Sequence, residues 1–147
     1  MNLLTGEYNN SIDEKGRVSF PVKLRTAVNQ NELIITKGLD TCLWLFTNEE
    51  WESFASKIMS NASMMKQKNL DVVRHFIAPA QPVEFDKAGR LSIPQSLREY
   101  AHLSKECTVL GIARYVELWD TATYGEYLTA SEASFREAAS EFNDISF

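Results

Sequence analysis

The chain has few of the residues that build metal centres and disulfides. Its 147 residues include two cysteines, Cys42 and Cys107, and two histidines, His75 and His102, and each pair is widely separated in the sequence. No C-x-x-C spacing is present, so the sequence predicts no metal site and no cofactor. The two thiols are expected to be reduced and buried.

Long apolar segments are missing too. No run approaches the roughly 18 residues needed to cross a membrane. The first ten residues, MNLLTGEYNN, lack the basic and apolar regions of a secretory signal. We therefore expect a cytoplasmic protein with no membrane partner.

The motifs of common enzyme classes are also absent. The sequence contains no nucleophile elbow, no H-E-x-x-H and no phosphate-binding glycine loop. The two histidines are expected to be packing or surface residues. The sequence therefore predicts neither an enzyme nor a small-molecule substrate.

A net charge of −5 argues against a nucleic-acid partner at first sight. Acidic residues are concentrated at 117–147, where seven acids accompany one base, Arg136. Residues 1–25 hold four bases against three acids, so a local basic face remains possible.

One motif occurs twice. Residues 11–21 read SIDEKGRVSFP and residues 84–94 read EFDKAGRLSIP, which share D-x-x-G-R-x-S-x-P at a constant shift of 73 positions. The shift continues through Leu24 and Leu97 and reaches Trp51 and Tyr124. We interpret the chain as two copies of one module, at 5–58 and 78–131, with a largely helical connector at 59–77 and an acidic C-terminal tail at 132–147.

Each copy predicts the same α+β elements. A strand ends at Ile12 or Phe85, and a turn leads to a second strand at 17–20 or 90–93. A helix follows with Pro21 or Pro94 in its first position. The remaining expected elements are strands at 32–37, 42–46, 107–112 and 115–119, and two helices capped by Thr47 and Asp120.

The short first helix is expected to bury Leu24, Ala27 and Val28 in the first copy, with Leu97, Tyr100 and Ala101 as their equivalents. One copy of about fifty residues buries too little apolar surface to be comfortably stable. We therefore expect the two copies to pack face to face, related by a pseudo-twofold axis, as one compact unit.

The D-x-x-G-R motif predicts a three-residue hairpin turn. Gly16 and Gly89 suit the left-handed position of such a turn. Asp13 would then face Arg17 across the hairpin, and Asp86 would face Arg90. Two interpretations stay equally open: the ion pair only closes the hairpin, at about 0–1 kcal/mol, or the strands present a functional arginine to a DNA groove.

These residues resemble a known family. The twice-written D-x-x-G-R-x-x-x-P with LR after the proline is similar to MraZ, a family of bacterial transcriptional regulators with two SpoVT/AbrB-type modules. KGLDTCLWLF, RHFIAPA and YVELWD strengthen the likeness, which covers about residues 3–128. The resemblance implies AbrB-like swapped-hairpin β/α modules whose β-hairpins interlock.

The resemblance also implies a function. Such proteins form ring homo-oligomers that bind direct repeats in double-stranded DNA, usually as repressors of the division and cell-wall operon that contains their own gene. They are cytoplasmic and associated with the nucleoid. Arg17 and Arg90 match the DNA-contacting arginine, and Lys15 matches the turn lysine. The second copy departs from the pattern, because Ala88 replaces that lysine and Lys87 is its basic turn residue. Lys23 and Arg25 are further candidate DNA contacts.

Two other functions remain as alternatives. AbrB-like modules also serve in antitoxins, although these usually carry one module and a disordered tail. A structural oligomer without a DNA role is the second alternative.

Overall fold

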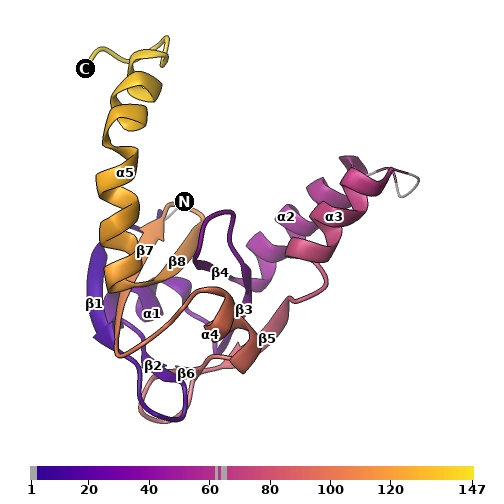
Figure 1. The fold of residues 1–147 in the computed structure, drawn as a ribbon. Coiled ribbons are helices and arrows are strands. Elements are labelled where there is room, and N and C mark those ends of the chain that lie inside the picture. Colours follow the sequence, from indigo (N-terminus) through magenta and orange to yellow (C-terminus); the bar gives the residue numbers. More distant parts are fainter. Residues whose placement is uncertain (1–2, 62, 64–65) are drawn as a thin grey trace.

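The computed structural model of the chain describes residues 3–61, 63 and 66–147. In chain order its strands and helices are β1 (Glu7–Ser11), β2 (Arg17–Ser19), α1 (Val22–Val28), β3 (Glu32–Lys37), β4 (Leu43–Phe46), α2 (Asn48–Asn61), α3 (Gln67–Phe76), β5 (Gln81–Glu84), β6 (Arg90–Ser92), α4 (Gln95–Tyr100), β7 (Glu106–Ile112), β8 (Tyr115–Asp120) and α5 (Thr121–Ser140). The chain is thus a compact α+β protein with antiparallel sheets (Figure 1).

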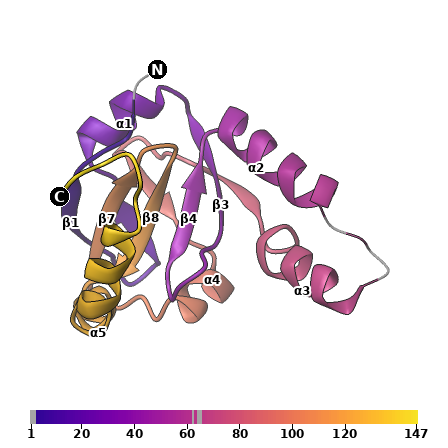
Figure 2. The ribbon, with the colours of Figure 1, turned by 90° about the horizontal axis from the view of Figure 1, so that it is seen from above.

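The strand order shows how the two copies combine. One sheet has the order β1-β7-β8-β4-β3-β5, and a second, two-stranded sheet consists of β2 and β6. The shift of 73 relates β1, β3 and β4 of copy one to β5, β7 and β8 of copy two. When each strand is exchanged for its equivalent in the other copy, the same strand order results, read from the opposite edge of the sheet. The two copies therefore share one sheet, with β4 and β8 paired at its centre (Figure 2), and do not stack face to face as the sequence suggested. Pairing β4 with β8 gives the backbone groups of both strands hydrogen-bond partners that two stacked sheets would leave open.

Strands also cross between the copies. The first strand of copy one, β1, pairs with β7 of copy two, and β5 of copy two pairs with β3 of copy one. β2 pairs with β6, with Val18 opposite Leu91. Residues of both copies share one hydrophobic core, in which Val18, Leu24, Leu91 and Leu97 are almost completely buried. Neither copy could form this core alone.

The short helices differ slightly from expectation. The sequence predicted Pro21 and Pro94 as the first helical residues, but they are the N-cap residues of α1 and α4, which begin one position later. Their φ angles of −57° and −56° suit proline, and their extended ψ angles keep them outside the helix. On α1, Leu24 and Val28 are buried as predicted, but Ala27 is exposed.

The longer helices begin at the predicted caps. The Thr47 hydroxyl accepts a hydrogen bond from the backbone N–H of Glu50 at 3.3 Å, and the Asp120 carboxylate accepts one from Thr123 at 3.2 Å. Aromatic residues then fix each helix to the sheet. Trp51 and Phe54 pack on Phe46, whereas Tyr124 and Tyr127 pack on Trp119.

Two helical segments project from the sheet (Figure 1). The hairpin of α2 and α3, called the arm below, contains the segment predicted as a helical connector; residues 62, 64 and 65 of that connector lie outside the described residues. α5 continues from Thr121 to Ser140 across the boundary at 131 where the sequence suggested a separate tail. None of the described helices is both long and apolar enough to span a membrane.

Both cysteines are free and fully buried, as expected. Burial raises the pKa of the Cys107 thiol to about 12 and also raises that of Cys42. Both are therefore protonated and inert near neutral pH.

Candidate nucleic-acid interface

The first copy of the repeated motif forms a tight turn held by Asp13. One carboxylate oxygen, Oδ1, accepts hydrogen bonds from the backbone N–H groups of Lys15 at 3.0 Å and Arg17 at 2.9 Å. The other, Oδ2, accepts one from Nε of Arg17 at 2.7 Å. Gly16 closes the turn with a φ of +80°, a conformation that costs glycine little.

The second copy repeats this geometry. Asp86 accepts backbone hydrogen bonds from Ala88 and Arg90, each at 2.9 Å, and a side-chain hydrogen bond from Nε of Arg90 at 2.9 Å. Gly89 has a φ of +75°. The same five positions therefore produce the same turn in both copies.

Both aspartates stay ionised in this arrangement. The backbone N–H of the arginine at the end of each turn is the main cause that lowers the pKa of Asp13 and Asp86 below the usual value of 3.8. The arginine side chain adds to the effect. Each carboxylate therefore keeps its negative charge and its hydrogen bond from Nε of the arginine.

The two turns lie side by side. Pairing of β2 with β6 joins the hairpins, and the Gly16 carbonyl accepts a hydrogen bond from the backbone N–H of Ile93 at 2.8 Å. Nη1 of Arg90 lies 3.8 Å from Oδ2 of Asp13, so one carboxylate of copy one faces both arginines. Figure 1 shows both turns at the end of the molecule opposite α5.

The two arginines differ in how much of the guanidinium is free. Nε of Arg17 is engaged with Asp13, and the described part of the chain supplies no hydrogen bond to either Nη group of Arg17. Arg90 uses Nε in the same way but shares Nη1 with Asp13. The arginine side chains are 30% and 32% exposed, so the Nη groups can reach a ligand from outside.

Arg25 and Arg98 cross between the copies and pack on the opposite turns. A Cβ atom added to Gly16 would lie 1.6 Å from Nη1 of Arg98, and one added to Gly89 would lie 1.6 Å from Nη1 of Arg25. Arg98 also donates to the Ile93 carbonyl at 2.7 Å and to the Lys15 carbonyl at 3.4 Å. Each turn thus needs glycine for its backbone conformation and for the close approach of an arginine.

Sequence reasoning missed Arg98. The LR pair after each proline relates Arg98 to Arg25 by the shift of 73, and this signal could have identified it. Of the predicted residues, Lys15 and Lys87 lie exposed in the two turns. Lys23 is exposed on α1, outside the turns.

The ends of the hairpins are locally basic. We define this surface, the hairpin end, as residues 13–17 and 86–90 with Arg25 and Arg98. It carries six cations and three anions, although the whole chain has a net charge of −5. The cations are Lys15, Arg17, Arg25, Lys87, Arg90 and Arg98.

The described residues hold no cluster of metal-binding side chains. No group of three or more His, Cys, Asp or Glu side chains there is arranged to hold a metal ion. The His75 ring contacts the Gly38 carbonyl through Nε2 at 2.7 Å. His102 is exposed at a φ of +55° just after α4.

Comparison with known proteins gives the family. Residues 3–74 and 76–144 each match the family described as "MraZ protein, putative antitoxin-like". The second match includes most of the segment that the sequence suggested as a separate tail. A curated relative, "Transcriptional regulator MraZ" of Treponema denticola, is 49% identical over 144 residues, which cover 98% of this chain and 100% of the relative. The protein of the same description from Treponema pallidum is 44% identical over 144 residues, covering 98% and 97%.

These matches cover nearly the whole chain and include both copies of the module. The chain belongs to the MraZ family of transcriptional regulators, which are not enzymes, and contains two tandem MraZ domains.

Proposed function

We propose that this protein binds double-stranded DNA in a sequence-specific way through its hairpin end. The observation that carries the proposal is the pair of aspartate-held arginines on adjacent hairpins of an otherwise acidic protein. The proposed contacts are Lys15, Arg17, Lys87, Arg90, Lys23 and Arg25.

The chemistry of Arg17 suits base recognition. Because Asp13 holds Nε, the guanidinium loses little side-chain freedom on binding, and its two Nη groups remain as donors. Such a fork can donate two hydrogen bonds to O6 and N7 of guanine, a pairing worth about 1–3 kcal/mol of discrimination. A two-stranded β-ribbon is narrow enough to enter the major groove.

The two modules contribute unequally in this proposal. Arg17 is the principal contact, because Arg90 shares one Nη group with Asp13 and Ala88 replaces the turn lysine. Arg25 and Arg98 hold the turns in position and bring positive charge close to the phosphates. Lys23 would contact phosphate from α1.

Oligomerisation explains how an acidic protein could bind DNA. One molecule offers few cations. Each phosphate contact contributes only about −0.9 to the slope of log K, the binding constant, against log salt concentration, so a single molecule should bind weakly. A ring that repeats the hairpin end would bind successive direct repeats together, and avidity would add a factor of about 10² to 10⁴. α5, which carries the acidic residues Glu126, Glu132 and Glu137, points away from the hairpin end (Figure 1), which is compatible with such docking.

The biological role follows from this mode of binding. We propose a cytoplasmic, nucleoid-associated regulator with AbrB-like swapped-hairpin modules. It represses the division and cell-wall operon that contains its own gene by binding direct repeats upstream. No cofactor and no small-molecule substrate are required for this activity.

An antitoxin role is the second candidate, because the matched family is described as antitoxin-like. It differs from the first in requiring a toxin partner. A structural oligomer without a DNA role is the third.

The test is a binding titration with fluorescently labelled DNA that carries one, two, three or four copies of the upstream repeat. We expect the affinity to rise at least 10²-fold from one to several repeats, and scrambled DNA to bind only weakly. No preference for the upstream DNA would refute the proposal and favour the other candidates. Equal affinity for one and several repeats would refute the avidity mechanism alone.

A further inference from the structure

α5 carries a stripe of mainly apolar residues that the other described residues leave largely uncovered. Positions 124, 128, 131, 135 and 138 follow the alternating spacing of four and three that places residues on one side of a helix. Leu128 and Phe135 on this stripe are 48% and 66% exposed, and Phe142, just after the end of the helix, is 59% exposed. Only the beginning of α5 contacts the sheet, through Tyr124 and Tyr127 on Trp119. Several large apolar side chains exposed in one row are typical of an interaction site.

The pseudo-symmetry shows what kind of partner is missing. The shift of 73 relates α2 to the first part of α5. α2 has a partner helix, because Phe54 packs edge-on against Phe76 at the end of α3, with ring centroids 5.5 Å apart. The equivalent of Phe54 is Tyr127, which is 40% exposed, and among the described residues no helix follows α5. α5 is thus a surface that lacks a helical partner.

A groove of matching character lies on the arm. Phe54, Ile58 and Val72 form an apolar floor between α2 and α3, with Lys57, Asn61 and Asn69 around it. Lys68 is one helical turn before Val72 and shares its side of α3. Val72 is 43% exposed. An amphipathic helix fits such a groove through apolar anchors spaced by three and four residues.

The charges of the two surfaces are complementary. Residues 57–74 of the arm contain four bases and one acid, and residues 126–144 contain five acids and one base. Opposite charges of this kind favour the approach of α5 to the arm and disfavour contact between two copies of α5.

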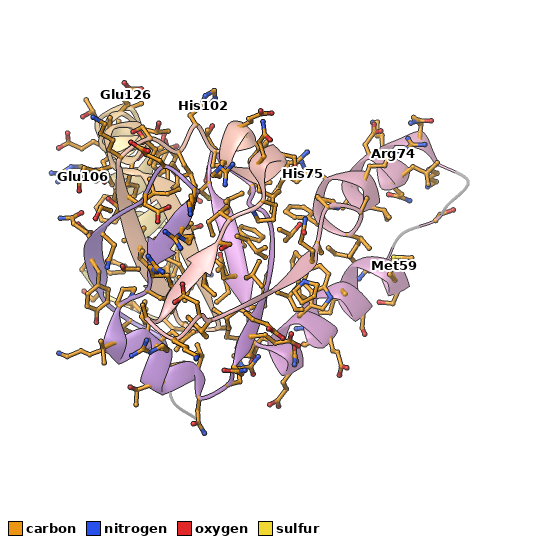
Figure 3. All side chains as sticks on the ribbon, turned by 90° about the horizontal axis from the view of Figure 1, so that it is seen from below. Met59, Arg74, His75, His102, Glu106 and Glu126 are labelled. Atoms are coloured by element: carbon orange, nitrogen blue, oxygen red, sulfur yellow. The ribbon has the colours of Figure 1, made fainter. Side chains whose placement is uncertain are left out.

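Both surfaces belong to one chain but cannot meet within it. α5 and the arm project from different ends of the sheet and diverge in Figures 1 and 2. In Figure 3, Met59 and Arg74 mark the arm on one side of the molecule, and Glu126 marks α5 on the other.

We propose that the apolar stripe of α5 docks into the arm groove of a second copy of the chain. The contact is heterologous, since one molecule contributes its α5 stripe and the other its arm groove, and the pair keeps one groove and one stripe free. Repetition of such a contact closes into a ring when the rotation allows it. This contact would join neighbouring subunits of the ring in the proposed function, on which it rests. It can be tested without DNA, because it concerns assembly alone.

Two single substitutions block one surface each. Val72→Glu places a negative charge in the groove that receives an acidic helix, and Phe135→Glu removes the most exposed apolar side chain of the stripe. Val22→Glu is the matched control, because Val22 on α1 is 65% exposed, like Phe135 at 66%. All three sites are at the surface, so circular dichroism and melting curves should show folded proteins.

The measurement is the mass in solution without DNA, by light scattering after size-exclusion chromatography. We expect the unmodified protein and Val22→Glu to form the same oligomer of several 16.7 kDa chains, and Val72→Glu and Phe135→Glu each to be monomeric. A mixture of the two blocked variants should give a 1:1 dimer and nothing larger. The intact groove of one variant then binds the intact helix of the other.

Three results would overturn the proposal. They are a monomeric unmodified protein, a Val72→Glu variant that still forms the full oligomer, and a mixture that stays monomeric. The second would point to a contact between two α5 helices. None of these results depends on DNA binding, so a failure here is distinct from a failure of the proposed function.

Discussion

Substitution of Gly16 by alanine tests how the hairpin end is built. The new Cβ would lie 1.6 Å from Nη1, 2.5 Å from Cζ and 3.0 Å from Cδ of Arg98, so the arginine must leave the turn. Alanine at a φ of +80° also costs about 1–2 kcal/mol. Loss of the hydrogen bonds from Arg98 to Ile93 and Lys15 adds about 1–2 kcal/mol, discounted for partial exposure.

The expected loss is therefore about 2–4 kcal/mol in the free energy of unfolding, or a fall of roughly 5–15 °C in Tm for a chain of this size. Urea denaturation followed by tryptophan fluorescence measures it. Gly125→Ala is the matched control: Gly125 is in α5 with nothing within 4 Å of an added Cβ. It should stabilise the helix by about 0.5–1 kcal/mol.

A double-mutant cycle separates the two parts of the loss. Because Gly16→Ala already displaces Arg98, adding Arg98→Ala should cost little more. The two single losses should then exceed the double loss by about 1 kcal/mol. The reasoning is refuted if Gly16→Ala is as harmless as Gly125→Ala, or if the two losses simply add.

Two further changes follow from the aspartates. Asp120→Ala should lower the free energy of unfolding by about 1–3 kcal/mol, because it removes the cap of α5 and leaves N–H groups of Ser104 and Thr123 without their acceptor. Asp120→Asn keeps an acceptor oxygen and should cost less. Equal stability of both variants and the unmodified protein in urea would contradict this. Acid should also weaken the hairpin end. Since Asp13 and Asp86 have lowered pKa values, their stabilisation is complete above their usual value of 3.8 and is lost as the pH falls through the lowered values. A variant with both replaced by Asn should show a smaller loss of stability in this acid range, and an unchanged acid profile would refute the assignment.

The sequence predicted what depends on local spacing. The turns form because D-x-x-G-R supplies a carboxylate, a left-handed glycine and a cation at fixed separations, and these contacts span only four residues. The caps at Thr47 and Asp120 are local in the same sense. The shift of 73 then transfers each local prediction from one copy to the other.

Contacts between distant segments could not be predicted in this way. Nothing in the pattern of β4 or β8 shows that the two strands pair with each other, because either would suit another apolar neighbour. The position of Arg98 on Gly16 depends on this long-range arrangement. The continuation of α5 past residue 131 has a simpler cause. Its alanines and glutamates favour a helix. Apolar and polar residues alternate only weakly between the sides of α5, so the stripe could not be recognised from the sequence pattern.

The central claim is that the hairpin end binds DNA through Arg17. The most direct test compares Arg17→Ala with Arg114→Ala by fluorescence anisotropy on the upstream DNA, with melting curves of both proteins. Arg114 is an exposed arginine between β7 and β8, paired with Glu50 at 3.2 Å, and it lies outside the hairpin end, the groove and the stripe. We expect Arg17→Ala to lose at least about tenfold in affinity, equivalent to about 1.4 kcal/mol. Its free energy of unfolding should change by about 1 kcal/mol or less, and Arg114→Ala should bind like the unmodified protein. Normal DNA binding by Arg17→Ala would contradict the account.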